Sequence, residues 1–410
     1  MKYITKRDGR QVPFNKNKII TAILKAFIAV DGEVSDYATE KANKIADFIE
    51  NKLQDEHLGV EDIQDFVEKG LMSTKRKDVA RAYITYREER ARIRSWNNKM
   101  MDKVAVKLEA TDVQNQNANI DEYSFGGRRG EADGVIFKQY ALDNLMSEMA
   151  RNNHLNNEIY IHDLDSYALG MHNCLSIPFD KLLAEGFNTR QTDVRPANSI
   201  NTAFQLVAVI FQLQSLQQFG GVSATHLDWT MVPYVRKSFW KHFKDGVKYL
   251  GGTPISDIMS IDHEDFKRQT KVYKYAMDMT TRETQQAVEG MYHNLNTLQS
   301  RSGNQLPFTS INYGTCTLPE GRLVIRALLE GSIKGVGKLH KTPIFPCGIF
   351  QYMKGVNDKP GTPNYDLYQL ALESTARRLY PNYANVDWSG NAGYDVNDPK
   401  TYFSTMGLAA

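Results

Sequence analysis

The sequence contains very little cysteine. Cys174, Cys316 and Cys347 are the only cysteines in 410 residues, and none of them belongs to a Cys-x-x-Cys pair. An odd and sparse set of this kind argues against a scaffold held together by disulfides. Without a Cys-x-x-Cys pair, the thiolates also give no basis for predicting a structural zinc site.

The sequence also lacks a strong charge of either sign and a long apolar run. Its formal net charge is +2, which gives no indication of binding to bulk nucleic acid or to a membrane surface. The longest apolar run, Leu206–Phe211, is far shorter than the ~20 residues that a membrane-spanning helix needs. Residues 1–6 contain no apolar signal-peptide core, so we expect a cytoplasmic protein without nucleic-acid or membrane partners.

The remaining composition is that of a soluble globular protein. Hydrophobic residues make up 41% of the chain and charged residues 24%, so a large core is available. Because domains usually hold about 100–200 residues, we expect two or three of them.

Residues 1–95 predict a small α+β unit. Two short β-prone runs, Tyr3–Lys6 and Gln11–Phe14, flank an Asp-Gly pair, which is typical of a hairpin. Asn15 is placed to cap a helix that follows. Four helices are predicted from apolar residues at helical spacing, namely Ile19, Ile20, Ile23, Leu24, Phe27 and Ile28; Ala42, Ile45, Ala46, Ile49 and Leu53; Val60, Ile63, Phe66, Val67 and Leu71; and Val79, Ala82, Tyr83 and Tyr86.

A linker and a second domain are expected after this unit. Asn and Gln cluster within residues 96–122 and the apolar periodicity fades there, which indicates a linker. From residue 123 to residue 410, helical and strand-like segments mix, which favours an α/β domain. Loop–strand elements are predicted at Leu306–Tyr313, Leu323–Ile325 and Thr342–Pro346, and the predicted helices include Ser199–Phe219 and Tyr365–Leu379.

Four cations gather around the predicted hairpin and the start of the first helix: Lys6, Arg7, Arg10 and Lys18. A helix N-terminus favours anions through its unpaired N–H groups and its dipole. The cluster therefore predicts a place for phosphate groups, although solvated surface charge beside a turn explains the same residues.

The order of the hairpin, a Lys-Arg-Asp-Gly turn, Asn15, Lys18 and four helices resembles the ATP-cone, a regulatory domain of ribonucleotide reductases. The resemblance implies that ATP and dATP compete as allosteric effectors. It assigns nucleotide contacts to Lys6, Arg7, Asn15 and Lys18, with Ile4 and the helix near Val60 beside the adenine. A cone-containing transcriptional repressor is an alternative, but it would need a small zinc ribbon, for which no Cys-x-x-Cys pair is present.

Cys174 lies in a second distinctive region. Taken alone, a single cysteine is usually a small buried hydrophobe, and His162 beside Asp163 is usually a structural hydrogen-bonded pair. The segments Asn117–Glu131 and Tyr160–Pro178, however, resemble the start of the catalytic domain of anaerobic (class III) ribonucleotide reductase, a glycyl-radical enzyme with an α/β barrel. We therefore expect the ATP-cone to be followed by the first part of such a barrel.

The resemblance to this family implies a chemistry for these residues. Family members reduce ribonucleoside triphosphates to deoxyribonucleoside triphosphates: a cysteine thiyl radical takes the 3′ hydrogen, and a second cysteine donates hydrogen after water has left. Cys174 matches the second cysteine and His162 a residue of the substrate pocket. The family also implies a radical-SAM activating enzyme and a homodimer, whose contact region matches Pro196–Thr202 and the helix after it. Cys316 and Cys347 are expected to be packing residues.

The segment Tyr402–Gly407 resembles the approach to the family's finger loop. In the family, the thiyl cysteine, a zinc-binding cysteine cluster and the radical glycine come after this segment, whereas this sequence ends at Ala410. We therefore expect the polypeptide alone to be inactive as a reductase. An alternative is a catalytically inactive regulatory or interaction protein that binds nucleotides.

Overall fold

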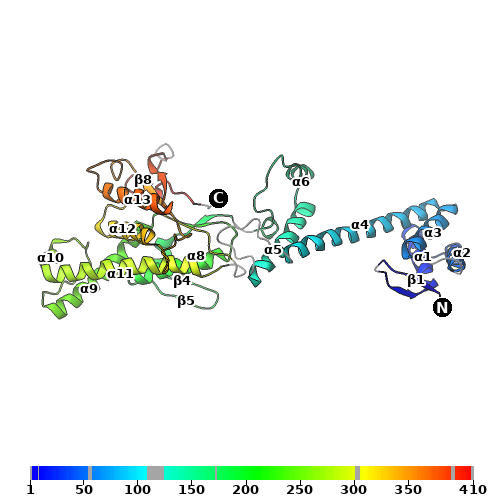
Figure 1. Cartoon of the computed structure of the whole chain (residues 1–410), viewed down its shortest axis with the longest axis horizontal. Helices are drawn as coiled ribbons and strands as arrows, with labels where there is room; N and C mark the ends of the chain where they lie inside the picture. Colours follow the sequence, from blue (N-terminus) through cyan, green and yellow to red (C-terminus); the bar gives the residue numbers. More distant parts are fainter. Residues whose placement is uncertain are drawn as a thin grey trace. The chain divides into compact units, whose positions relative to one another are not determined.

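The computed structural model describes residues 2–7, 9–53, 58–108, 124–170, 173–300, 305–388 and 393–407, without the side chains of residues 96–99. The chain divides into two compact units, Met1–Lys103 and Val104–Ala410 (Figure 1). Each unit has a hydrophobic core of its own. None of the helices in the described stretches combines the length and the apolar character that crossing a membrane requires.

The first unit begins with the predicted hairpin. Strands β1 (Tyr3–Thr5) and β2 (Gln11–Pro13) pair antiparallel, and Ile4 lies opposite Val12. The turn closes through a hydrogen bond of 2.8 Å from the Lys6 N–H to the Arg10 carbonyl oxygen. Gly9 has a φ of 80°, a conformation that glycine adopts without a steric penalty.

Four helices follow, as the apolar spacing predicts: α1 (Lys16–Asp31), α2 (Asp36–Lys52), α3 (Val60–Ser73) and α4 (Lys77–Leu108). Their inward faces form one core in which Ile23, Phe27, Ile49 and Leu71 are fully buried. Ile28 was expected in this core but is 43% exposed. It follows Phe27 directly, and the ~100° turn per helical residue directs it away from the buried row.

Helix α4 is longer than the sequence indicated. It continues to Leu108, so residues 96–108 of the predicted linker are helical. Residues 109–122 of that prediction lie outside the described residues. The polar residues of this helix do not interrupt it, because an exposed α-helix satisfies its backbone hydrogen bonds internally.

The second unit is built on a parallel sheet of five strands. They are β3 (Leu175–Ser176), β6 (Val222–Ala224), β7 (Thr309–Tyr313), β8 (Cys347–Tyr352) and β9 (Asn382–Asn385). Spatial order follows chain order, β3-β6-β7-β8-β9, as in the first part of an α/β barrel. All five residues of β7 are buried, which is typical of parallel strands covered on both faces. The predicted α/β class is confirmed.

Helices connect and cover these strands. The longer ones are α8 (Ile200–Ser215), α9 (Leu227–Leu250), α11 (Thr270–Thr297), α12 (Pro319–Lys334) and α13 (Tyr365–Arg378). The other elements of this unit are α5 (Phe125–Tyr140), η1 (Ala141–Leu145), α6 (Glu148–Leu155), η2 (Tyr167–Leu169), α7 (Phe179–Glu185), β4 (Phe187–Asn188), β5 (Asp193–Val194), α10 (Glu264–Lys267) and η4 (Pro399–Thr401).

One of the loop–strand predictions needs correction. Leu323–Ile325 was predicted as strand-like but lies inside α12, which begins with Pro319 at a position where proline fits a helix. Val324, Ile325 and Leu328 are buried on one face at helical spacing, so a short apolar run was mistaken for a strand. Thr342–Pro346 is the loop that leads directly into strand β8, which agrees with a loop–strand element at this place.

Candidate functional site

The first unit contains a cavity of about 800 Å³ between α1, α3 and α4. Its walls combine amide, hydroxyl, cationic, small and aromatic side chains. The lining residues are Asn15, Asn17, Lys18, Thr21, Ala22, Lys25, Ala26, Ala29, Gln64, Ala82, Tyr83, Tyr86, Arg87, Arg90 and Arg94. Asn15 and Lys18, both predicted as nucleotide contacts, are therefore part of it.

The charge of this cavity has one sign. Five of the lining residues are cationic, and none of them is acidic: Lys18, Lys25, Arg87, Arg90 and Arg94. A dense group of cations in a hollow attracts an anion with several charges, such as a chain of phosphates.

Small and aromatic residues form the remaining wall. Alanines at positions 22, 26 and 29 leave room along α1, and Tyr83 and Tyr86 face the cavity from α4. Burial raises the pKa of Tyr83 to about 12, so its hydroxyl stays protonated and can donate a hydrogen bond. The Arg90 guanidinium lies 5.7 Å from the centre of the Tyr86 ring. An aromatic wall beside cations suits a ligand with a flat ring and an anionic tail.

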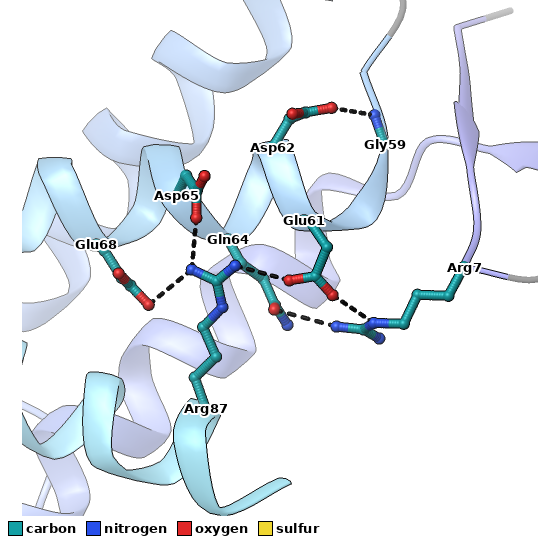
Figure 2. Close-up of polar contacts among 8 residues, drawn as sticks. All are labelled: Arg7, Gly59, Glu61, Asp62, Gln64, Asp65, Glu68 and Arg87. Atoms are coloured by element: carbon teal, nitrogen blue, oxygen red, sulfur yellow. Dashed lines mark hydrogen bonds and ion pairs between the residues drawn. The ribbon is translucent and has the colours of Figure 1, made fainter. Parts of the chain in front are cut away.

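Arg87 lines the cavity and also contacts three carboxylates of α3 (Figure 2). Its Nη1 donates to Asp65 at 2.6 Å and to Glu68 at 2.8 Å, and its Nη2 donates to Glu61 at 2.7 Å. The Arg87 side chain is 18% exposed, so these contacts are partly shielded from water.

Arg7 reaches the same helix from the turn of the hairpin (Figure 2). Its Nε donates to Glu61, and its Nη2 donates to Gln64 at 3.1 Å. The hydrogen bond from Arg87, followed by that from Arg7, lowers the pKa of Glu61 against the opposing effect of burial. Arg7 was predicted as a nucleotide contact, but it does not line the cavity and is separated from it by Gln64.

The structure places the other residues that were predicted around the nucleotide differently with respect to the cavity. Lys6 is exposed in the turn and does not line the cavity. Asn15 occupies the N-cap position of α1, but its side chain makes no capping hydrogen bond. Ile4 packs against the core, and neither it nor Val60 lines the cavity, whose apolar wall comes from α1 and α4 instead.

Cys174 directly precedes β3, at the edge of the parallel sheet. Its thiol donates to Asn173 Oδ1 at 3.4 Å, and its sulfur accepts a hydrogen bond from the Gly221 N–H at 3.2 Å. Gly220 packs so closely on Asn173 that a Cβ there would lie 1.8 Å from the Asn173 carbonyl oxygen. Cys174 is partly exposed, whereas Cys316 and Cys347 are buried.

Among the described residues, no contact joins His162 to Cys174. Its Nδ1 pairs with the neighbouring Asp163, and its side chain is 77% exposed. Burial raises the pKa of Cys316 and of Cys347, so both remain thiols, as expected of packing residues. The described residues contain no group of three or more His, Cys, Asp or Glu side chains that could hold a metal ion.

The segment 403–407 lies against the sheet and is held by two buried amides. Asn312 on β7 donates to the carbonyl oxygen of Thr405 at 2.9 Å and accepts from its N–H at 3.1 Å. Gln351 on β8 donates to the carbonyl oxygen of Phe403 at 3.0 Å. At the end of the segment, a Cβ on Gly407 would lie 2.9 Å from the Cβ of Cys347.

Comparison with known proteins defines the class of this chain. A family model described as anaerobic ribonucleoside-triphosphate reductase matches residues 116–407, and a model described as ATP cone domain matches residues 2–92. The chain therefore belongs to the anaerobic ribonucleoside-triphosphate reductase family, and its N-terminal unit is a cone domain.

Individual relatives agree with this assignment. The chain is 32% identical to the anaerobic ribonucleoside-triphosphate reductase of Haemophilus influenzae over 388 residues, which cover 94% of this chain and 52% of the relative. The anaerobic ribonucleoside-triphosphate reductase of Escherichia coli is also 32% identical, and the match covers 94% of this chain and 51% of the relative. The chain thus spans about half the length of these relatives. A structure of the Thermotoga maritima anaerobic ribonucleotide reductase in complex with dATP and CTP aligns with a TM-score of 0.44 at 13% identity, covering 70% of this chain and 47% of that one.

Proposed function

We propose that the cone domain binds ATP and dATP as competing allosteric effectors in the cavity between α1, α3 and α4. The observation that carries this proposal is the cavity wall, which has five cations, two tyrosines and no acidic residue. Its size of about 800 Å³ lies within the range of small-molecule and cofactor sites. In this arrangement Lys18, Arg87 and their neighbours bind the phosphates, and the base lies beside Tyr83 and Tyr86.

Titration calorimetry of the chain with ATP and with dATP tests this proposal. Both nucleotides should bind, and each should displace the other. Lys18→Glu reverses one charge of the cavity and should weaken ATP binding by roughly tenfold or more, because a charge-assisted contact contributes about 1.5–3 kcal/mol. Lys69→Glu is a matched control, since Lys69 is exposed on α3 and does not line the cavity. Equal affinities for Lys18→Glu and the unaltered chain would contradict the site.

For the second unit, we propose a part in the anaerobic reduction of ribonucleoside triphosphates. Cys174 donates hydrogen to the sugar, and His162 belongs to the substrate pocket. Membership of the family supports this role, as does the partly exposed position of Cys174 at the edge of the sheet. The proposal includes a homodimer, a glycyl radical generated by a radical-SAM activating enzyme, and zinc bound outside the residues described here.

Because the polypeptide alone is expected to be inactive, the role of Cys174 is tested by deoxynucleotide formation in a chain extended by the part of a full-length relative that lies beyond its match, with the activating enzyme and formate present. Cys174→Ser should abolish turnover without changing ATP binding to the cone, whereas Cys347→Ala should retain turnover. Turnover by Cys174→Ser at the unaltered rate would exclude the assigned role. Nucleotide binding without turnover by the chain alone is expected for a regulatory protein and for part of an enzyme, so that result does not separate the two; turnover by the extended chain excludes the inactive regulatory protein.

A further inference from the structure

Arg87, one of the five cations of the nucleotide cavity, is paired with carboxylates that do not line it. Glu61, Asp65 and Glu68 lie on one face of α3, at spacings of four and three residues, and all three contact Arg87. Carboxylate and phosphate oxygens accept the same forked hydrogen bonds from a guanidinium group. These three acidic residues therefore occupy donors of Arg87 that a phosphate would use.

Glu61 holds two arginines at once. Its Oε1 accepts from Arg7 in the hairpin turn, and its Oε2 accepts from Arg87 of α4 at 2.7 Å (Figure 2). Glu61 therefore joins two parts of the cone that are far apart in the sequence, and among the described residues no other carboxylate contacts both arginines. Its side chain is 53% exposed, so a ligand entering from solvent can compete for these partners.

The base of the hairpin is fixed independently of these charges. The Thr5 N–H donates to the Leu58 carbonyl oxygen at 3.1 Å, and Thr5 forms a parallel bridge with Gly59. Arg7 lies in the turn, beyond this attachment. It does not line the cavity itself but contacts Gln64, which does. A change of partner by Arg7 thus requires a movement of the turn and of its own side chain, while the strands stay paired.

We propose that Glu61 is a positioning residue that holds Arg7 and Arg87 in the nucleotide-free cone, and that the phosphates of a bound nucleotide take both guanidinium groups from it. This inference rests on the proposed nucleotide site. It explains why Arg7 lies next to the cavity without lining it. Nucleotide binding then releases the hairpin turn from α3, so the occupied and empty cones differ in how the turn is attached.

The test is ATP titration of Glu61→Gln in the whole chain. The amide keeps the shape of the side chain but removes its charge, so less attraction has to be overcome when the arginines change partner. Exposed and partly exposed ion pairs contribute about 0.5 kcal/mol each, and Glu61 makes two of them, so ATP should bind roughly fivefold more tightly. Glu40→Gln is the matched control: Glu40 pairs with Lys44 on α2, away from the cavity, and its variant should bind ATP as the unaltered chain does.

A double-mutant cycle separates this role from a general structural effect. In an Arg7→Ala background, Glu61→Gln should lose part of its effect on ATP affinity, because one of the two partners is gone. Hydrogen exchange at residues 6, 7, 9 and 10 should accelerate when ATP is added to the unaltered chain. In the Glu61→Gln variant, hydrogen exchange at these residues should already be fast before ATP is added.

Unchanged or weaker ATP binding by Glu61→Gln, with normal binding by the unaltered chain, would overturn the inference and leave the nucleotide site standing. Failure of the unaltered chain to bind ATP would instead remove the proposed function. If Glu61→Gln does not fold, Glu61→Asp keeps the charge but shortens the side chain, which weakens its hold on the two arginines, and should tighten ATP binding about twofold by the same reasoning. An unchanged affinity in that variant counts against the inference equally.

Discussion

In the cone, the charged side chains that define the candidate site are at the surface, whereas in the second unit several polar side chains with many contacts are buried. Arg7 and Glu61 are both exposed and form a direct ion pair at the surface. Asp228, Asn312 and Gln351 are fully or almost fully buried and hold backbone groups. Exposed pairs exchange partners at little cost, while buried polar groups destabilise the fold when a partner is lost. The cone is therefore suited to responding to a ligand, and the sheet unit to holding a fixed geometry.

The largest effect is expected from Asp228→Ala. Asp228 accepts backbone hydrogen bonds from Gly314 and Cys316, both at 2.9 Å, and from Trp229 at 3.1 Å. Removal of the carboxylate leaves three donors without this partner and should lower the free energy of unfolding by about 3–5 kcal/mol. Urea unfolding measures this loss of stability. Asp257→Ala, which changes an exposed residue, is the control. A loss below ~1 kcal/mol would remove the contrast between the two units.

Asn312→Ala should have the next largest effect. It removes both hydrogen bonds to the backbone of Thr405 and a third, of 3.0 Å, to the Ala224 carbonyl oxygen. We expect the segment 403–407 to detach from β7, with a local loss of about 2 kcal/mol. Hydrogen exchange at the Thr405 amide should accelerate by roughly 30-fold, since 1.4 kcal/mol corresponds to a factor of ten. Thr401→Ala, in the same stretch but without contact to Asn312, should leave this exchange unchanged.

Acid should weaken the second unit through Asp180. Despite the raising effect of burial, hydrogen bonds from His226 and Thr230 lower the pKa of Asp180 to about 2. Because the folded-state pKa is below the unfolded one, the carboxylate stabilises the fold above about pH 4, and this stabilisation is lost as the pH falls from about 4 to about 2. The loss should be roughly 1–2 kcal/mol, since Asp180 is 30% exposed. Asp180→Asn should flatten this part of the stability profile, and an unchanged slope would contradict the assignment.

The smallest effect is expected from an exposed pair of the cone. Glu40 and Lys44 form an ion pair of 2.6 Å on successive turns of α2, and both side chains are more than half exposed. Glu40→Gln should leave the thermal midpoint of the cone unchanged, because solvent screens such pairs. A clear fall in the midpoint would show that surface charge in the cone has a structural role and would weaken the comparison with the buried groups.

The sequence predicted local features of the cone better than the site that they form. The hairpin and the four helices follow from turn chemistry and apolar spacing near the N-terminus, whereas Asn15 and Lys18 were assigned to the nucleotide by the resemblance to the ATP-cone. Arg87, Arg90 and Arg94 were missed as lining residues, because α1 and α4 meet only in the folded domain. A local signal was present, since these three arginines share one face of a charged helix.

In the second unit, periodicity separated helix from strand only where the segments were long. Leu323–Ile325 was predicted as a loop–strand element because three apolar residues in a row fit a helix or a strand equally well. In the structure these residues belong to α12, which packs against α9 and α11. Asn312 lies in a predicted strand, but its bond to Thr405 joins residues 93 apart and has no local signature. The role of Cys174 was inferred from resemblance alone and remains a prediction.

The order of strands in the sheet has a consequence for biosynthesis. Each strand from β6 to β9 is placed beside the strand that precedes it in the sheet and is separated from it by a helical crossover. As the polypeptide leaves the ribosome, every new strand meets a template edge that is already assembled, so the sheet can grow by successive addition. In each intermediate, the edge of the last strand added stays open until the next crossover and strand are translated, and a ribosome that stalls within α9 or α11 would leave that edge available to other chains.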